Sequence, residues 1–418
     1  MEYKRLCAVY DALGATTKRL QKTQILSEFL RTISSDEMEH VLRLLQGKVF
    51  PNWDSRTLGF SAQLVIKSFI RATGASDDEI MQQWKIIGDL GKVAGALVGK
   101  KKQVTLFSES LTTQKVYSNL RKMATLEGTG VVSAKVSLAA ELLSNASPIE
   151  AQYITRTILE DLRIGLGEGT LRDSLVWAFE GQRLGIGYDA EKNDIILPDD
   201  DRTAYEAASE KYQDAYDLAN DFARVASVAQ RDGIDGLATI TLTAGAPVKV
   251  MLFQKAPTMK DALETCGVPC AIDYKYDGFR MQVHKNADGI TIFTRRLENV
   301  TAQFPDVVKA VAEHVKGESF IIDCEAVGID VKTHKYVSFQ TISQRIKRKY
   351  DIEELGKKFP VELDIFDVLL YNGKNLVHEP FSVRRESLSS LLPRTVPGVI
   401  SLANQTIVDN EVDAQAVY

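Results

Sequence analysis

Apolar residues in the first half of the chain recur with the period of an α-helix. Val136, Ala139, Ala140 and Leu143 fall at i, i+3, i+4 and i+7, which is the spacing of one buried helix face. Residues 147–150 read Ser-Pro-Ile-Glu, a capping box with proline at the first helical position, and predict the start of another helix. We therefore expect residues 1–235 to form one helix after another.

Two stretches interrupt this helical pattern. Residues 181–209 are first glycine-rich and then acidic, which predicts an exposed insertion. Helix is expected again over residues 212–228, and the glycine-containing residues 233–245 are interpreted as a linker.

Beyond the linker the apolar residues alternate, which is typical of β-strands. Residues 281–284 and 290–293 flank an Asn-Ala-Asp-Gly sequence at 286–289, a pattern that predicts a β-hairpin. Residues 319–327 and 361–370 are two further predicted strands, with helical stretches between them. The expected fold is multidomain: an all-α domain over residues 1–235, followed by an α+β domain with an antiparallel sheet over residues 236–418.

Composition narrows the class of protein but not its partner. A chain of 418 residues with 44% hydrophobic and 26% charged residues is typical of soluble globular proteins. It has no apolar run long enough to span a membrane and no secretory signal, which points to the cytoplasm. The net charge of −5 neither supports nor excludes a nucleic-acid partner, because phosphate binding depends on a local basic surface.

Candidate chemistry centres on Lys275, within the sequence Ala-Ile-Asp-Tyr-Lys-Tyr-Asp-Gly-Phe-Arg at 271–280. Alternating apolar residues predict a strand that holds Lys275 on rigid backbone. A partly desolvated lysine near other cations can have its pKa lowered enough to act as a nucleophile. Asp-Gly at 277–278 predicts a tight turn, and Arg280 offers a planar fork for phosphate or ribose oxygens. An edge lysine beside an ordinary turn is the alternative from these residues alone.

Several basic or glycine-rich stretches of the first half lie at predicted helix ends. Backbone N–H groups at such positions bind phosphate oxygens readily, although the same residues also serve simply to end one helix and begin the next. The candidate DNA-binding residues of this half are Lys18, Arg19, Lys48, Arg163, Gly165 and Gly167.

Two other segments carry features of a binding surface. Lysines 100–102 precede Gln103, Leu106 and Phe107. An exposed Leu-Phe pair is costly, so we expect these two side chains to be buried either in the core or against a partner protein. In the second half, a basic run contains Arg345, Lys347 and Arg348. Its side chains are expected to contact a DNA backbone, and the alternative is that they form a solvated helix face.

Three more stretches follow Lys275 in a fixed order. They are Phe-Thr-Arg-Arg-Leu-Glu-Asn-Val-Thr at 293–301, Asp-Cys-Glu-Ala at 323–326 and Phe-Asp-Val-Leu at 366–369. With residues 271–280, this set resembles the nucleotidyltransferase motifs of ATP-dependent DNA ligases of the archaeal and eukaryotic replicative type. Residues 46–53, 161–171 and 215–222 resemble that family's helical DNA-binding domain. The resemblance covers nearly the whole chain except residues 181–209.

The resemblance implies a reaction. Lys275 would attack the α-phosphorus of ATP to form lysyl-AMP, the AMP would pass to a DNA 5′-phosphate, and a 3′-hydroxyl would displace it to seal the nick during replication and repair. The implied cofactors are ATP and Mg²⁺. The implied partners are nicked duplex DNA and a sliding clamp, because residues 103–107 align with a clamp-binding sequence of archaeal ligases. The protein is expected to act as a monomer.

The resemblance also implies roles for other residues. Arg280 and Arg295 match positions that contact the ribose and phosphate of the nucleotide or the nick ends. Glu325 matches an acidic residue near the ribose and the catalytic metal, and Phe366 matches an aromatic residue that stacks on adenine. Asp273 stands where the family often has a glutamate that reads the adenine amino group.

The chain departs from the family pattern at its end. It stops before a Glu-Gly-x-x-x-Lys motif and an OB-fold domain, so we expect the 418-residue chain alone to be impaired in ligation. Two alternatives are an RNA ligase or RNA-capping nucleotidyltransferase, which shares the lysine motif, and a non-catalytic DNA- and clamp-binding protein. An NAD-dependent ligase is disfavoured, because the four cysteines form no CxxC pair for a zinc site.

Overall fold

The fold is known from a computed structural model of residues 1–418. It describes the chain apart from residues 52, 55, 101–109, 252, 331, 334 and 348–350, and it describes only the backbone of residues 200, 346 and 347. The chain forms two compact units, Met1–Thr241 and Leu242–Tyr418. Among the described residues, no helix is both long and apolar enough to cross a bilayer.

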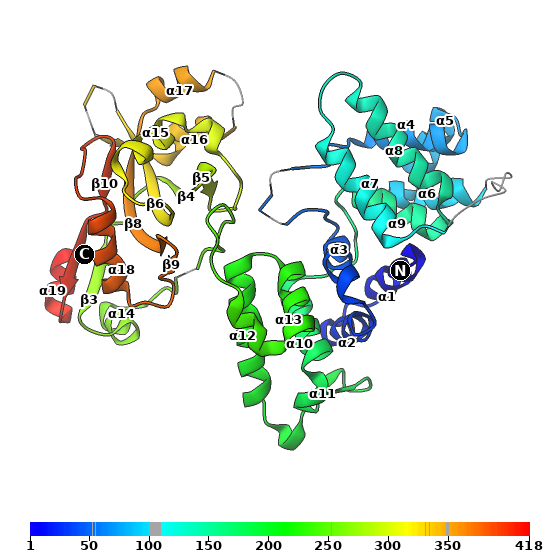
Figure 1. The fold of residues 1–418 in the computed structure, drawn as a ribbon, viewed down its shortest axis with the longest axis horizontal. Coiled ribbons are helices and arrows are strands. Elements are labelled where there is room, and N and C mark those ends of the chain that lie inside the picture. Colours follow the sequence, from blue (N-terminus) through cyan, green and yellow to red (C-terminus); the bar gives the residue numbers. More distant parts are fainter. Residues whose placement is uncertain are drawn as a thin grey trace. The chain divides into compact units, whose positions relative to one another are not determined.

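Unit 1 is built from helices around one apolar core (Figure 1). The α8 stripe expected from the sequence is buried: Val136, Ala139, Ala140 and Leu143 all lie in the interior. The predicted capping box is also present, because the Ser147 side chain accepts from the backbone N–H of Glu150 and the Glu150 carboxylate accepts from the backbone N–H of Ser147. The helices are α1 Tyr3–Gly14, α2 Arg19–Leu30, α3 Ser35–Leu45, α4 Ala62–Thr73, α5 Asp77–Ile87, α6 Leu90–Gly99, α7 Thr113–Thr125, α8 Val131–Asn145, α9 Pro148–Ile158, α10 Glu168–Phe179, α11 Gly181–Leu184, α12 Thr203–Ala219 and α13 Phe222–Gly236.

The single helix expected over residues 212–228 is in fact the meeting point of two helices. Asn220 adopts a left-handed conformation with φ 47° and ends α12, and the Asp221 side chain caps the first turn of α13. Asparagine tolerates this conformation better than most residues, and aspartate is a preferred N-cap. Apolar periodicity continues across the break because both helices bury one face, so periodicity alone did not reveal it.

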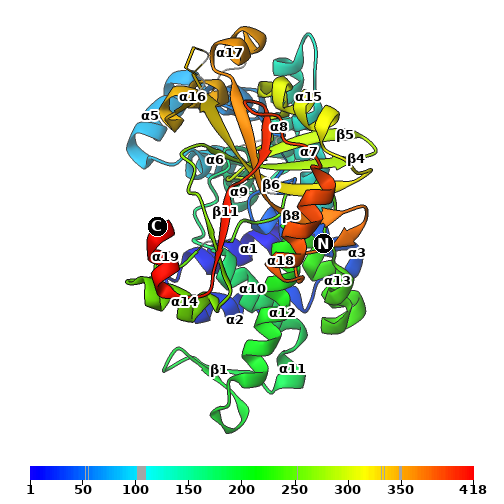
Figure 2. The same cartoon turned by 90° about the vertical axis from the view of Figure 1, so that its left-hand side faces the viewer.

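The segment expected as an insertion contains regular structure. Strands β1 Gly187–Asp189 and β2 Asp194–Ile196 form a short antiparallel hairpin, followed by the 3₁₀ turn η1 Pro198–Asp200. The hairpin projects from the helices of unit 1 (Figure 2). The expected linker is likewise partly helical, because α13 extends to Gly236 and the 3₁₀ turn η2 Leu237–Thr239 follows.

Unit 2 contains an α+β arrangement around a mainly antiparallel sheet, as expected. The sheet has the order β10-β8-β6-β4-β5, and among the strand pairs that the structure describes only β10–β8 is parallel. The strands are β3 Cys270–Asp273, β4 Phe279–Asn286, β5 Gly289–Thr294, β6 Phe320–Ile329, β7 Tyr336–Val337, β8 Val361–Tyr371, β9 Lys374–Asn375, β10 Ile400–Leu402 and β11 Gln405–Val408. The helical elements are α14 Met259–Cys266, η3 Thr301–Gln303, α15 Pro305–His314, α16 Phe339–Lys347, α17 Ile352–Lys358, α18 Phe381–Leu391 and α19 Glu411–Val417.

The central strands place their side chains on two different faces. Alternate residues of β6, including Phe320, Ile322, Cys324 and Ala326, are buried in the apolar core of unit 2. Because side chains alternate along a strand, the intervening residues of β6 lie on the opposite face. That face carries the charged residues of the candidate site.

Candidate functional site

Lys275 lies in the connection between two sheets. Strand β3 ends at Asp273 and pairs with β11 in a separate two-stranded sheet, whereas β4 begins at Phe279 in the main sheet. Lys275 is therefore exposed and outside any strand, so the expected rigid strand and desolvation are wrong. The alternating sequence was misleading here because it continues through a loop that passes from one sheet to the other.

A row of polar residues crosses the main sheet beside this loop. Arg280 on β4 is directly opposite Glu325 on β6, which is opposite Asp364 on β8, which is opposite Ser401 on β10. Directly opposed residues of neighbouring strands share a face. The row therefore gathers two acidic groups and one basic group on one side of the sheet.

Arg280 is held in place within this row. Its Nη2 donates to Oδ2 of Asp323 at 2.6 Å, and its guanidinium carbon lies 5.5 Å from the centroid of the Phe366 ring. Asp323 is buried, so the pair fixes one end of the guanidinium near the aromatic ring. The predicted nucleotide-binding residues Arg280 and Phe366 thus lie together.

Phe366 owes its orientation to an irregularity in β8. Asp323 pairs with Asp367 and Cys324 pairs with Ile365, so Phe366 is the extra residue of a β-bulge. Bulges often redirect a side chain next to a functional site. A sequence scan finds the aromatic residue but cannot find the bulge, because the bulge depends on the pairing register.

Glu325 is a carboxyl group whose pKa is affected by the charge of Lys275. Burial raises the pKa of Glu325 to about 7, and the positive charges of Arg280 and Lys275 offset part of that rise. The backbone N–H of Gly278 also hydrogen-bonds to this carboxyl group and favours its charged form. Lys275, Arg280 and Glu325 therefore lie near enough for both positive charges to act on the carboxyl group, and their roles stay predictions.

Gly278 is needed for close approach. A Cβ atom there would lie 2.6 Å from the carbonyl oxygen of Ala326 and 2.7 Å from Cγ of Glu325, distances that real side chains do not reach. The sequence-based interpretation of Asp-Gly as a turn missed this reason. The glycine lets the lysine loop lie directly against β6.

The two other predicted nucleotide-binding residues are both exposed. Asp273 is exposed, and its Oδ1 accepts a hydrogen bond from Nε2 of Gln405 at 3.0 Å. Arg295 is exposed in the turn after β5, where the Thr294 hydroxyl accepts from the backbone N–H groups of Arg296 and Glu298. Their roles stay predictions.

The helical unit brings most of its candidate DNA-binding residues to the contact between α2 and α10. Lys18 is the exposed residue before α2, and Arg19 forms an ion pair with Asp173 of α10. Arg163 and Gly165 both have left-handed backbone, with φ 58° and 59°. Gly167 begins α10, and nothing lies within 4 Å of a Cβ built on it.

Lys22 is a member of this face that sequence reasoning missed. It is buried, and its Nζ donates to the carbonyl oxygens of Ile164 and Gly165 at 2.6 and 2.8 Å. A Cβ at Gly165 would lie 2.7 Å from this Nζ. The sequence does contain a signal for it, because Lys22 follows Lys18 by one helical turn and so lies on the same side of α2.

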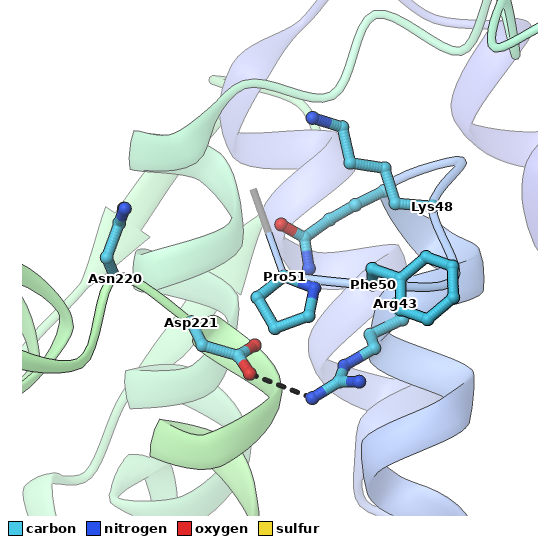
Figure 3. Close-up of a pocket in the computed structure, with 7 residues that line it drawn as sticks. Arg43, Lys48, Phe50, Pro51, Asn220 and Asp221 are labelled. Atoms are coloured by element: carbon cyan, nitrogen blue, oxygen red, sulfur yellow. Dashed lines mark hydrogen bonds and ion pairs between the residues drawn. The ribbon is translucent and has the colours of Figure 1, made fainter. Parts of the chain in front are cut away.

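Lys48 lies at a different place in unit 1, beside a small pocket (Figure 3). The pocket is formed where residues 46–53 meet residues 215–222, two of the stretches that carried the sequence resemblance. Below it, Nη2 of Arg43 donates to Oδ2 of Asp221 at 2.9 Å, whereas Lys48 is exposed. The lining residues are Arg43, Gln46, Lys48, Phe50, Pro51, Asn220 and Asp221.

Arg345 does not fit the role expected from its basic run. Its side chain is only 1% exposed. Its Nη1 donates to Oδ2 of Asp306 at 2.9 Å and to the carbonyl oxygen of Phe359 at 3.0 Å. Arg345 therefore links α16 to its neighbours inside unit 2 and is not a surface contact for DNA.

The remaining predicted site residues cannot be placed. The side chain of Lys347, the whole of Arg348 and the predicted clamp-binding residues Gln103, Leu106 and Phe107 lie outside what the structure describes. Within the described part, no group of three or more His, Cys, Asp or Glu side chains is arranged to hold a metal ion. Glu325, the metal ligand predicted from the sequence, lies on β6.

Comparison with known proteins gives matches along both units. The family model described as DNA ligase N terminus matches residues 2–176, and the one described as ATP dependent DNA ligase domain matches residues 250–418. A DNA ligase of Nanoarchaeum equitans is 38% identical over 94% of this chain and 64% of its own length. A DNA ligase of Thermococcus fumicolans is 37% identical over 100% of this chain and 70% of its own length.

Similarity to solved structures is remote. The structure described as "Pmar-Lig_Pre." is 13% identical, with a TM-score of 0.45, over 99% of this chain and 69% of that one. The chain spans about two thirds of the length of the curated relatives that it matches. By its identity to these relatives, the chain belongs to the ATP-dependent DNA ligase family.

Proposed function

We propose that this chain carries the DNA-binding and adenylation parts of a ligase that seals nicks in duplex DNA at the expense of ATP. The observation that supports this most is the position of Lys275, exposed on a loop beside Glu325 and Arg280. A free amine beside a charged, partly buried sheet face suits attack on a nucleotide phosphate.

In the proposed first step the Lys275 amine forms a P–N bond to the α-phosphorus of ATP. The bond from that phosphorus to the bridging oxygen breaks, pyrophosphate leaves with the electron pair, and the amine loses a proton. The product is lysyl-AMP. The AMP then moves to a DNA 5′-phosphate, and a 3′-hydroxyl displaces it and joins the strands.

The residues around Lys275 suit the substrate. Arg280 has one guanidinium edge paired with Asp323 and offers its remaining donors to ribose or phosphate oxygens. Phe366 presents an aromatic ring on the same face, suited to stacking on a purine. Asp273 ends β3 two residues before Lys275 and is the residue proposed to contact the base.

Glu325 fits a magnesium ligand. Mg²⁺ prefers oxygen ligands and usually takes one or two protein carboxylates together with substrate phosphates and water. A single carboxylate beside the attacking lysine matches that pattern, whereas Asp323 is already paired with Arg280. Bound Mg²⁺ would neutralise phosphate charge, and Glu325 would hold it on the sheet face.

The face between α2 and α10 is the proposed DNA contact of unit 1. The exposed Lys18, the backbone at Gly165 and the first turn of α10 after Gly167 together offer cationic groups and N–H donors to phosphate oxygens. A sliding clamp is the proposed protein partner and the monomer is the proposed state. The support for the clamp is the sequence of residues 103–107 alone.

The proposed chemistry predicts covalent labelling of the protein by one class of nucleotide. We expect the chain with Mg²⁺ to take up label from α-labelled ATP but not from γ-labelled ATP, α-labelled GTP or NAD labelled in its adenylate. Label should stay with the denatured protein in alkali and be released by acid, as a P–N bond requires. Preference for GTP would favour an RNA-capping enzyme, and absence of label from every nucleotide would contradict the proposed function.

A further inference from the structure

Residues 403–405 contact the chain on both sides of Lys275. They are the turn between β10 and β11 together with the first residue of β11, and they are called the turn below. The backbone N–H of Tyr274 donates to the carbonyl oxygen of Asn404 at 3.4 Å. The backbone N–H of Asn404 donates to the hydroxyl oxygen of Tyr276 at 3.1 Å. One residue of the turn therefore hydrogen-bonds to both chain neighbours of the lysine.

The same turn also reaches Asp273, two residues before the lysine. Gln405 is the register partner of Asp273 in the β11–β3 pair, and its side-chain Nε2 donates to the Asp273 carboxylate at 3.0 Å. Three successive contacts thus follow the chain from Asp273 to Tyr276, and none of the three involves the Lys275 side chain.

The turn is itself attached to the centre of unit 2. The backbone N–H of Ala403 donates to the carbonyl oxygen of Ile365 on β8 at 2.8 Å. From α18, Arg385 donates to the carbonyl oxygen of Ala403 and, at 3.5 Å, to that of Ile365. Ile365 directly precedes Phe366, so the strand that carries the stacking ring also holds the turn.

These contacts supply what the lysine loop lacks. Lys275 lies outside the strands and is exposed, so no ladder of sheet hydrogen bonds fixes its backbone. Attack on phosphorus depends on holding the reacting atoms in line, and a misplacement of about 1 Å lowers the rate by about a hundredfold. A loop fastened only at its ends would not meet that requirement.

We propose that the turn at residues 403–405 is a positioning element for the nucleophile, and that Tyr276 and Gln405 are the side chains through which it acts. The proposal rests on the proposed function. Tyr276 fixes the backbone of the lysine loop through Asn404. Gln405 orients the Asp273 carboxylate, which is the group proposed to read the base.

The two side chains are expected to affect different constants. Tyr276→Phe keeps the ring and its edge contact with Tyr336 but removes the oxygen that accepts from Asn404. We expect the single-turnover rate constant of self-adenylation at saturating ATP to fall about tenfold, the effect of one lost hydrogen bond in an oriented site. Gln405→Ala should instead raise the Kd for ATP and leave the rate constant at saturation close to that of the unaltered chain.

The experiment is single-turnover labelling of the 418-residue chain from α-labelled ATP, with rate constant, amplitude and Kd determined separately. Amplitude reports the fraction of competent protein, so a merely structural defect lowers amplitude and Tm and leaves the rate constant unchanged. Tyr188→Phe is the matched control, because it removes a tyrosine hydroxyl bonded to Asn193 in the β1–β2 hairpin of unit 1. We expect it to change none of the three quantities.

The outcomes separate the two proposals. Labelling of the unaltered chain with a slowed Tyr276→Phe variant and a weakened ATP affinity for Gln405→Ala supports the positioning role. Labelling at an unchanged rate in Tyr276→Phe, or a loss of amplitude only, would overturn that role and leave the proposed function intact. No label on the unaltered chain would overturn the proposed function, and the positioning role with it.

Discussion

At the scale of single residues, the buried His284 affects the stability of unit 2. Its Nδ1 accepts a hydrogen bond from the backbone N–H of Gly245 at 3.0 Å, and its Nε2 lies 2.9 Å from Oε1 of Gln282. Burial lowers the pKa of His284 to about 3. The neutral imidazole thus fastens the start of unit 2 to strand β4.

This shift predicts a dependence of stability on pH. The unfolded chain binds a proton at His284 below its ordinary pKa of about 6.5, whereas the folded chain does so only near 3, so stability falls as the pH drops through this window. The loss reaches at most about 5 kcal/mol, at about 1.4 kcal/mol per pKa unit. Urea unfolding of unit 2 between pH 7 and 4 should show a shallower decline for His284→Gln than for the unaltered chain.

The exposed His378 provides the control for this prediction. His378→Gln removes a histidine from the surface of the same unit and should leave the pH dependence of unfolding unchanged. Equal slopes for His284→Gln and the unaltered chain would show that His284 does not contribute to the acid sensitivity.

At the scale of elements, local patterns predicted helices and strands better than their ends or pairing. The capping box at Ser147 and the hairpin at β4–β5 are encoded in a few adjacent residues, and both were predicted. The break at Asn220, the loop around Lys275 and the bulge at Phe366 depend on register or on distant contacts. Those three features were missed, and two of them shape the candidate site.

The contact between α2 and α10 leads to a prediction about DNA binding. Lys22 bonds to two carbonyl oxygens of the turn before α10, so we expect it to hold the turn rather than neutralise a phosphate. Lys22→Met should weaken binding to nicked duplex DNA about tenfold, since a bond from a charged donor contributes about 1.5–3 kcal/mol. The slope of log K against log salt should stay the same.

Lys18→Met is the matched comparison, because Lys18 is exposed on the same face. Loss of one phosphate contact should reduce the magnitude of the salt slope by about one. Fluorescence anisotropy over a series of salt concentrations measures both quantities, and Tm checks the fold of each variant. If Lys22→Met reduced the slope as much as Lys18→Met, Lys22 would be a direct phosphate contact and the positioning account would be wrong.

At the scale of the whole molecule, the change in apolar period along the chain predicted the class of fold. Apart from the short β1–β2 hairpin, the regular structure described in unit 1 is helical, and unit 2 has a mainly antiparallel sheet with flanking helices. The sequence did not predict strands β10 and β11, because each is only three or four residues long. The turn between them is therefore visible only in the structure, although it contacts both neighbours of the predicted nucleophile.

The proposed first step requires Lys275 to be the residue that accepts AMP. The most direct test is to incubate the chain with ATP and Mg²⁺, digest it and locate the modified residue by mass spectrometry, alongside Lys275→Arg and Lys285→Arg. Lys275→Arg keeps the positive charge but removes the nucleophilic amine, and Lys285 is a lysine on the neighbouring strand β4. We expect AMP on Lys275 in the unaltered chain and in Lys285→Arg, and none in Lys275→Arg. AMP on another residue, or undiminished modification of Lys275→Arg, would contradict this expectation.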